Sequence, residues 1–317
     1  MPPPATAEAT DPSASADDAP DRRASTTDAP EPEPTATSVQ TPATGTRLSA
    51  AEIHDNVVVA ADEEMRRPTG ELALSAFQAG LMIGFSLLAS AYLASLVGPE
   101  HRAAAAAAGY PLGFIFVVLA RSQLFTENTL DPLLPLLERR DERTLRGVIR
   151  LWSIVLSGNL LGTLTFALIA THTPMIDEPL RTSLHGVAEH ATAGGFGIVF
   201  YRAIFGGWLV ALMAWLVAST SFTGAQILFV WLTTAPIAAF GFRHAIAGAA
   251  EAFYQAASGQ TTWGEMVGGF LVPAILGNIV GGGVLVALLN HGQVLSRVTS
   301  RMRRRRGEPG ARNPATA

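Results

Sequence analysis

Long apolar runs dominate the chain between residues 48 and 293, and short polar stretches separate them. A helix that crosses about 30 Å of hydrocarbon needs about 20 mainly apolar residues. Four runs reach this length without interruption, and each predicts a membrane-spanning helix: 72–97, 151–171, 196–219 and 266–289.

Two further apolar runs are long enough to span a membrane but are interrupted in the middle. Residues 103–137 contain the stretch ARSQLFTENT, and residues 223–257 contain FGFRHAIAG. A non-helical segment at membrane depth is tolerated only where it is buried in protein or lines a cavity. The pattern therefore predicts an all-α membrane protein of six spanning helices, in which the second and fifth are broken.

The two halves of this region resemble each other. GNLLG in the third span matches GNIVG in the sixth. Asn159 follows Phe125 by 34 residues, and Asn278 follows His244 by 34 residues, which makes Phe125 and His244 equivalent positions. Three spans repeated by three spans must place the second half upside down. We therefore predict two inverted repeats with the site between the breaks, a pattern typical of transport proteins.

The flanking segments have a different composition. Residues 1–47 are rich in Pro, Ala, Ser, Thr and acids, which predicts a disordered tail without a secretory signal. Ser49–Glu52 has the sequence of a capping box, and residues 48–67 are predicted to form an amphipathic helix. Residues 68–293 then form the transmembrane domain, and residues 294–317 form a basic tail.

Arginine placement predicts the orientation of the spans. The loop after the second span holds five arginines and the C-terminal tail holds seven, whereas the loops after spans one and three hold one each. Because positive loops stay in the cytoplasm, we expect both termini on the cytoplasmic side of an inner or plasma membrane.

Missing residue types exclude several kinds of chemistry. The chain of 317 residues has no cysteine, and all 22 basic residues are arginine. Disulfides, thiol nucleophiles, thiolate metal sites and lysine Schiff bases are therefore excluded. The motifs GxSxG and HExxH do not occur. We expect no enzyme, no metal, no cofactor and no nucleic-acid partner.

Several charged residues lie within the predicted spans, where polar groups are costly and usually face a cavity or a partner. Opposite charges suggest a network, with Arg121 paired to Glu127, and with Arg243 or Arg202 paired to Glu251 or Glu127. The alternative is that these arginines tie the ends of spans and extend to the interface.

His244 and Thr126 are the candidate pore residues in the two breaks. A neutral imidazole both donates and accepts hydrogen bonds, and a helix start favours an anion. His244 therefore suits a small weak-acid anion, although it could instead bond only a neighbouring carbonyl. Thr126 offers a hydroxyl beside the apolar Leu124 and Phe125, or alternatively it or Asn128 caps the following half-helix.

Asn159 and Asn278 are predicted to hydrogen-bond the exposed backbone of the two breaks, as a scaffold. The glycines beside them allow neighbouring helices to approach closely.

Over about residues 50–290 the chain resembles the formate/nitrite transporter family, as a divergent branch. The resemblance rests on an ordered set of segments: LFT, GNLLGTL, WLVALMAWL, GFRHAIAG and PAILGNIVGGGVLVAL. It implies a homopentamer of aquaporin-like six-helix protomers in the lipid bilayer. Each protomer would then have its own pore for small monovalent anions such as formate, nitrite or hydrosulfide.

The resemblance also implies roles for single residues. His244 matches the central pore histidine, and Thr126 matches the threonine of the broken-helix loop. Tyr110 and Phe114 fall where the family has its cytoplasmic hydrophobic constriction, and Ile237 falls where it has the periplasmic one.

Three positions depart from the family's pattern. Arg243 stands where an acid is usual, and Gly248 and Gly207 stand where asparagines are usual.

The function expected from this reading is a channel or transporter for small monovalent anions, with proton coupling through His244. The alternatives are a non-conducting or sensory membrane scaffold of the same fold, or a pore for another small solute. The paired NPA motif of aquaporins is absent from both breaks.

Overall fold

The structure, a computed structural model, describes residues 48–287 except the side chains of Leu285 and Val286, and these residues are helical with no strand. The predicted tails and the end of the last predicted span lie outside the described residues. The α-helices are α1 Ala50–Arg66, α2 Thr69–Ser95, α3 Arg102–Gly109, α4 Pro111–Leu119, α5 Leu133–Arg139, α6 Glu142–His172, α7 Glu178–Thr192, α8 Phe196–Ala218, α9 Thr223–Ala239, α10 Ala245–Ala257, α11 Trp263–Glu265 and α12 Val272–Ile279. Shorter 3₁₀ and π segments are η1 Pro99–His101, η2 Met266–Leu271 and η3 Val280–Val286.

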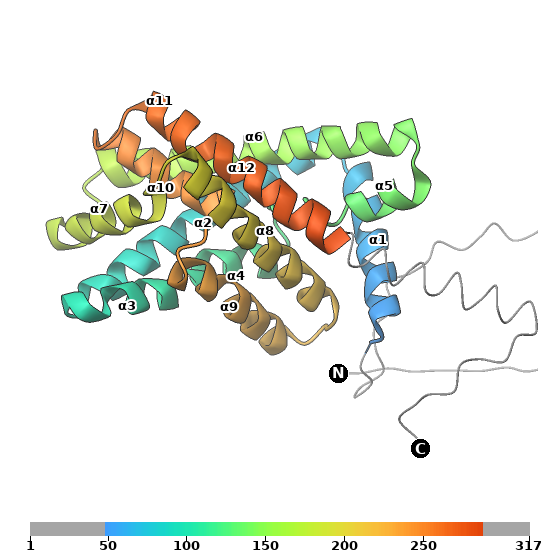
Figure 1. The fold of residues 1–317 in the computed structure, drawn as a ribbon, viewed down its shortest axis with the longest axis horizontal. Coiled ribbons are helices and arrows are strands. Elements are labelled where there is room, and N and C mark those ends of the chain that lie inside the picture. The colour runs from blue at the N-terminus through green and yellow to red at the C-terminus, as the bar shows by residue number, and fades with distance from the viewer. Residues whose placement is uncertain (1–47, 288–317) are drawn as a thin grey trace, which may run out of the picture. The chain divides into compact units, whose positions relative to one another are not determined.

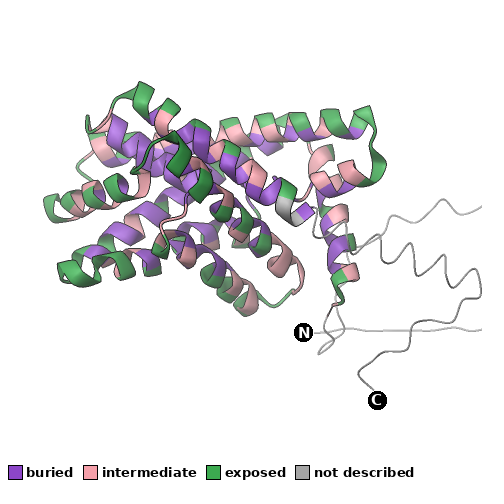
Figure 2. Ribbon diagram, viewed as in Figure 1, coloured by how far each residue is buried: buried purple, intermediate pink, exposed green. Residues whose placement is uncertain are grey.

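Within this part of the chain, five helical stretches are long and apolar enough to cross a membrane, and α9 is a shorter apolar helix of 17 residues. The five stretches are Thr69–Ser95, Pro99–Leu119, Glu142–His172, Phe196–Ala218 and Trp263–Val284. Their outward faces are exposed and their inward faces are buried (Figure 2).

The helices define two ends of the described region. α1 and α5 lie at one end, and α7 and the start of α3 lie at the other (Figure 1). α1 begins with the predicted capping box: the amide of Glu52 donates to the Ser49 hydroxyl, and the amide of Ser49 donates to the Glu52 carboxylate. Asp62 of α1 accepts two hydrogen bonds, of 2.7 and 2.5 Å, from Arg139 of α5. These bonds raise the pKa of the Arg139 guanidinium above its usual value.

Two helices stop in the middle of the bundle with the same backbone turn. α4 is followed by Arg121 in the left-handed region, with φ of 52°. α9 is followed by Gly241 in the same region, with φ of 66°. A left-handed residue after the last turn is a common way to end a helix, because it redirects the chain. The chain then runs irregularly before α5 and α10 begin, as the interrupted apolar runs predict.

α2 and α6 approach each other closely beside the first break. A Cβ on Gly80 of α2 would lie 2.9 Å from the Gly162 Cα and closer still to the carbonyl oxygen of Asn159, both in α6. Only a residue without a side chain fits between these two backbones.

Gly80→Ala should lower the free energy of unfolding by about 1–3 kcal/mol, because the added methyl pushes α2 away from α6. Gly70→Ala is the matched control in the same helix, since nothing lies within 4 Å of its added Cβ. The measurement is thermal unfolding of the purified protein in detergent. Equal melting temperatures for the two variants would contradict the close packing.

Candidate functional site

Asn159 holds the backbone of the first break. Its side-chain oxygen accepts a hydrogen bond of 2.8 Å from the amide of Phe125. Its side-chain nitrogen donates to the carbonyl oxygens of Ala76 and Gln123, both at 2.8 Å. The asparagine is fully buried, so these bonds replace the water that the broken backbone lacks.

Asn278 does the same at the second break. It accepts from the amide of Ala245 at 2.7 Å and donates to the carbonyl oxygens of Ala203 and Arg243, at 2.7 and 3.0 Å. Both asparagines therefore bond backbone groups of the breaks. The bonds pair Phe125 with Ala245, however, so the expected equivalence of Phe125 and His244 is wrong by one residue.

His244 and Thr126 meet between the two breaks. The Thr126 hydroxyl lies 2.7 Å from Nε2 of His244, and both residues are buried. Nδ1 of His244 accepts a hydrogen bond of 3.0 Å from the amide of Ala247, so the histidine caps its own helix, α10. Because a neutral imidazole carries one N–H, Nε2 must hold the proton and donate it to the Thr126 oxygen.

The hydrogen of the Thr126 hydroxyl therefore remains available. The structure thus differs from both simpler readings, in which His244 bonds only a carbonyl and Thr126 or Asn128 caps the next half-helix. That half-helix, α5, has Pro132 at its cap position.

Other polar side chains stabilise the first break, and of these only Asn128 was expected to bond there, as a helix cap. The Asn128 side-chain nitrogen donates to the Gln123 side-chain oxygen at 2.9 Å, and Trp152 donates to the Asn128 carbonyl at 2.7 Å. Phe125 lies edge-on to Trp152, and Leu124 is fully buried. The sequence contained a signal for these residues, because polar side chains inside an apolar run must find hydrogen-bond partners within the protein.

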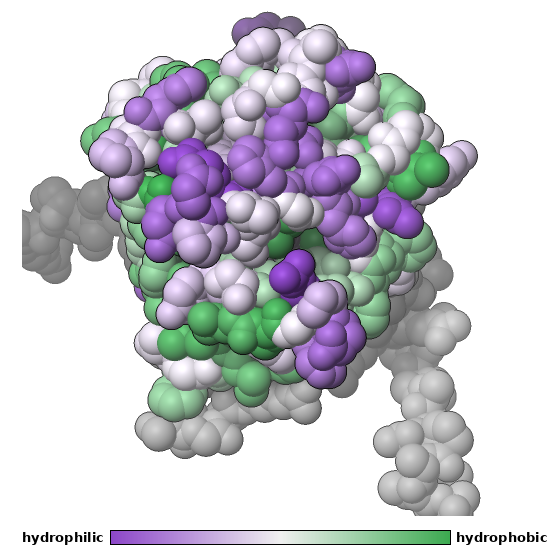
Figure 3. Space-filling model, turned by 90° about the vertical axis from the view of Figure 1, so that its left-hand side faces the viewer, coloured by the Kyte–Doolittle hydropathy of each residue, from purple (hydrophilic) through white to green (hydrophobic). Residues whose placement is uncertain are grey.

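A cavity of about 490 Å³ opens at the end opposite α1 and leads to His244. Its walls come from α2, α3, α7, the second break and α10. On this end of the molecule a hollow lies among hydrophilic residues (Figure 3). The polar and charged residues among its lining are Ser90, Ser95, Arg102, Tyr110, Thr182, Ser183, His190, Arg243, His244 and Glu251.

Arg243 is not ion-paired as expected. Within the described residues, no carboxylate lies within 4.0 Å of its guanidinium. Nη2 instead donates to the carbonyl oxygens of His190 and Ala193, at 3.1 and 2.9 Å. These carbonyls end α7, and the last carbonyls of a helix need donors from outside it.

The expected pair of Arg121 and Glu127 does not form either. Arg121 is exposed, and Oε1 of Glu127 is buried without a hydrogen-bond partner in the described part of the chain. Arg202 is exposed on α8 and lies over the turn at Gly241, outside the cavity. The left-handed turn directs the Arg121 backbone outward, which separates the two charges.

Tyr110 lines the cavity, and its assignment to a cytoplasmic constriction depends on which end of the molecule is cytoplasmic. It lines the cavity at the end opposite α1, so it cannot belong to a cytoplasmic constriction if α1 is cytoplasmic. The reason is that α3 begins at that end, and Tyr110 precedes the break. Phe114 lies one turn deeper, with its ring centroid 4.9 Å from that of His244. Ile237 is buried in the core near the end of α9 and is not part of the cavity wall.

α7 was missed as an element of the site. The segment after the third span was expected to be a loop. It forms α7, which supplies one wall of the cavity. The end of α7 also supplies the two carbonyl oxygens that accept hydrogen bonds from Arg243. A signal for it exists in the sequence, because Asp177 is an N-cap residue and Pro179 follows in the first turn.

Apolar spanning helices, two broken helices and a cavity that reaches His244 at the second break are typical of an integral membrane protein of the channel or transporter class. The model of the formate/nitrite transporter family matches residues 51–292, and the chain belongs to this family.

Two relatives and one solved structure illustrate the match. The chain is 33% identical over 246 residues to the inner membrane protein YfdC of Escherichia coli (strain K12), covering 77% of this chain and 79% of that one. It is 28% identical over 250 residues to a probable formate transporter of Methanothermobacter thermautotrophicus, covering 72% and 90%. A pentameric formate channel with formate bound shares the fold, with a TM-score of 0.62 and 24% identity over 72% of this chain and 98% of that one.

Asn159→Asp should lower the free energy of unfolding by about 2–5 kcal/mol, because the carbonyls of Ala76 and Gln123 lose their donor inside the protein. Ser153→Ala is the control in the same helix, since that exposed hydroxyl bonds only its own helix. Thermal unfolding in detergent measures both. An Asp variant as stable as the control would show that the break does not depend on Asn159.

Proposed function

We propose that the protein is a channel or transporter for small monovalent weak-acid anions such as formate or nitrite. The observation that carries the proposal is the contact between Thr126 and His244 at the inner end of the cavity. The amide of Ala247 orients the imidazole, the imidazole donates to Thr126, and the threonine hydroxyl can donate to an anion. Hydrogen bonds in such a chain polarise and strengthen one another.

The apolar surroundings complete the site. Phe114 lies against the imidazole, and Leu124 and Phe125 are buried beside Thr126. A constriction of this kind passes a dehydrated or neutral species more easily than a hydrated ion. A buried donor beside the constriction forms a stronger hydrogen bond with an anion than with a neutral solute of the same size.

The same proposal includes six spans, in which α3 and α4 begin the second and α9 and α10 form the fifth. The matched bonds of Asn159 and Asn278 support two inverted repeats. We further propose a homopentamer in the inner or plasma membrane with both termini cytoplasmic, as the arginine distribution and the pentameric structural relative suggest. The amphipathic α1 would then lie at the cytoplasmic end, and the cavity would open to the outside.

The non-conducting scaffold is the second candidate. It would be favoured if an arginine crossed the space in front of His244. Arg202 lies outside the cavity, and Nη2 of Arg243 is bound to the wall formed by α7. This arrangement supports the conducting form. A pore for another small solute would need a site without a directed donor, which fits the orientation of His244 less well.

The test is uptake of formate, nitrite, hydrosulfide and chloride into vesicles containing the purified protein, at two pH values. We expect saturable uptake of a weak-acid anion. His244→Ala should reduce it about 10- to 100-fold, because a hydrogen bond to a charged group contributes about 1.5–3 kcal/mol. Thr126→Val should act in the same direction, since it removes the hydroxyl that accepts the His244 hydrogen bond.

His172→Ala is the control, because this histidine is exposed at the end of α6. Its uptake should equal that of the unmodified protein. If the folded, unmodified protein takes up none of the four anions, the channel proposal fails and the scaffold candidate takes its place.

A further inference from the structure

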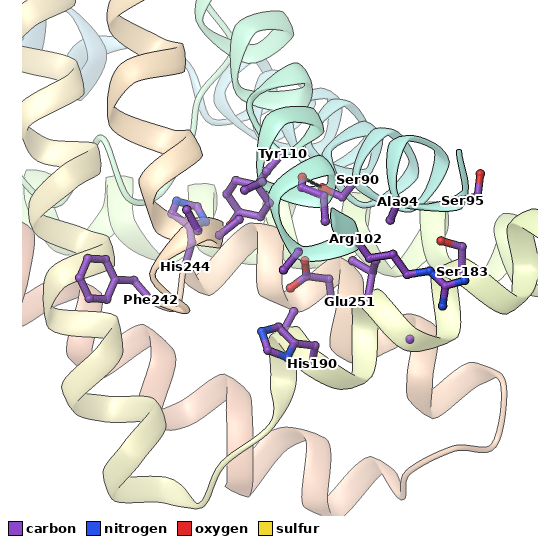
Figure 4. A pocket seen from close by; sticks show the side chains of 18 of the residues that line it. Ser90, Ala94, Ser95, Arg102, Tyr110, Ser183, His190, Phe242, His244 and Glu251 are labelled. Atoms are coloured by element: carbon purple, nitrogen blue, oxygen red, sulfur yellow. Dashed lines mark hydrogen bonds between the residues drawn. The ribbon is translucent and has the colours of Figure 1, made fainter. Parts of the chain in front are cut away.

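Two ionisable residues lie deep in the cavity, and of these Glu251 has no role in the hydrogen bonds described above, whereas Arg243 uses only Nη2 in them. Arg243 and Glu251 are each only 4% exposed, and both line the cavity. Glu251 lies between Tyr110 and His190 and is turned toward the open space (Figure 4). A buried charge without a partner is costly, so such residues mark a function more often than a structural role.

Neither residue has its hydrogen-bonding capacity filled. Nη2 of Arg243 is bound to α7, but Nε has no partner in residues 48–287. Glu251 makes no hydrogen bond and no ion pair within 4.0 Å in the same part of the chain. Arg243, whose Nε is itself inaccessible, and Glu251 thus line one open cavity of about 490 Å³.

Glu251 and His244 lie on the same path. They are seven residues apart, from the cap of α10 to its second turn, so their side chains share one face of the helix about 10 Å apart along its axis. An anion that enters past the exposed Arg102 and His190 meets Arg243 and Glu251 before it reaches His244.

His244 itself is poorly placed to deliver a proton. Its Nδ1 accepts from the Ala247 amide, and its Nε2 hydrogen is donated to Thr126. A second proton would break the first bond and leave a buried amide unpaired. The other ionisable residues that line the cavity with Glu251 are Arg102 of α3, Tyr110 between α3 and α4, His190 of α7, and Arg243 and His244 of the second break. Glu251 is the one carboxyl group among the residues that line the cavity.

We infer that Arg243 binds the anion in the cavity and that Glu251 donates a proton to it, so that a weak acid passes His244 as the neutral molecule. This inference rests on the proposed function. For formate, the carboxyl proton of Glu251 moves to a formate oxygen, giving formic acid and a Glu251 carboxylate near Arg243. A proton from the solution outside, which the open cavity reaches, then restores the Glu251 carboxyl group. The ligand class is a monovalent conjugate base of a weak acid.

The experiment measures formate uptake and internal acidification together, with a pH dye in vesicles, and subtracts the leak of protein-free vesicles. The unmodified protein should carry one proton with each formate, independently of an imposed membrane potential, and faster at lower external pH. Glu251→Gln should slow uptake at least about 100-fold, the low end for loss of a general acid. Its remaining uptake should depend on the membrane potential. Glu251→Asp keeps a carboxyl group and should keep the proton coupling.

Glu178→Gln is the matched control, because this carboxyl group lies at the same end but is 86% exposed and outside the cavity. Uptake that is unchanged in rate and proton coupling in Glu251→Gln would overturn the inference and leave the proposed function intact. Absence of any uptake by the unmodified protein would overturn both. If Glu251→Gln does not fold, the unmodified protein still decides, because formate uptake without protons contradicts the inference.

Discussion

Backbone N–H and C=O groups that leave a helix inside a membrane find no water there, so each must find a partner in the protein. The two breaks of this chain meet that requirement in the same way. Asn159 and Asn278 each accept from one amide and donate to two carbonyls, and each reaches the break from a different helix. In the breaks these bonds hold the backbone of Gln123, Phe125, Arg243 and Ala245.

The orientation of His244 follows from this scaffold. Asn278 holds the amide of Ala245 and the carbonyl of Arg243, the residues on either side of the histidine. The start of α10 then offers the Ala247 amide to Nδ1, which directs the Nε2 hydrogen toward Thr126 in the other break. Because this donor is already oriented, no free energy is spent on reorienting it when an anion arrives, which is the advantage of a preorganised site.

The charged residues around the site do not pair with one another, because each has a different partner or position. Arg243 binds the carbonyls that end α7, and Arg121 and Arg202 lie outside the cavity. Glu251 is left facing the cavity. Opposite signs near each other in a sequence predicted ion pairs, but orphan carbonyls at a helix end compete for the same guanidinium. This competition cannot be predicted from the sequence, because it depends on α7 lying beside the second break in the fold.

Local patterns in the sequence were sufficient for much of this protein. The spans, the two breaks, the capping box at Ser49 and the bond-forming role of Asn159 and Asn278 follow from apolar length and from the need to satisfy buried polar groups, which are properties of short segments. The family resemblance singled out His244 and Thr126 as pore residues. Their direct contact joins residues 118 positions apart, and only the packing of the two breaks creates it. The tertiary structure also decided the side on which Tyr110 lies, the partner of Arg243 and the exposure of Glu251 to the cavity, because each depends on which distant helix supplies the nearest donor, acceptor or open space.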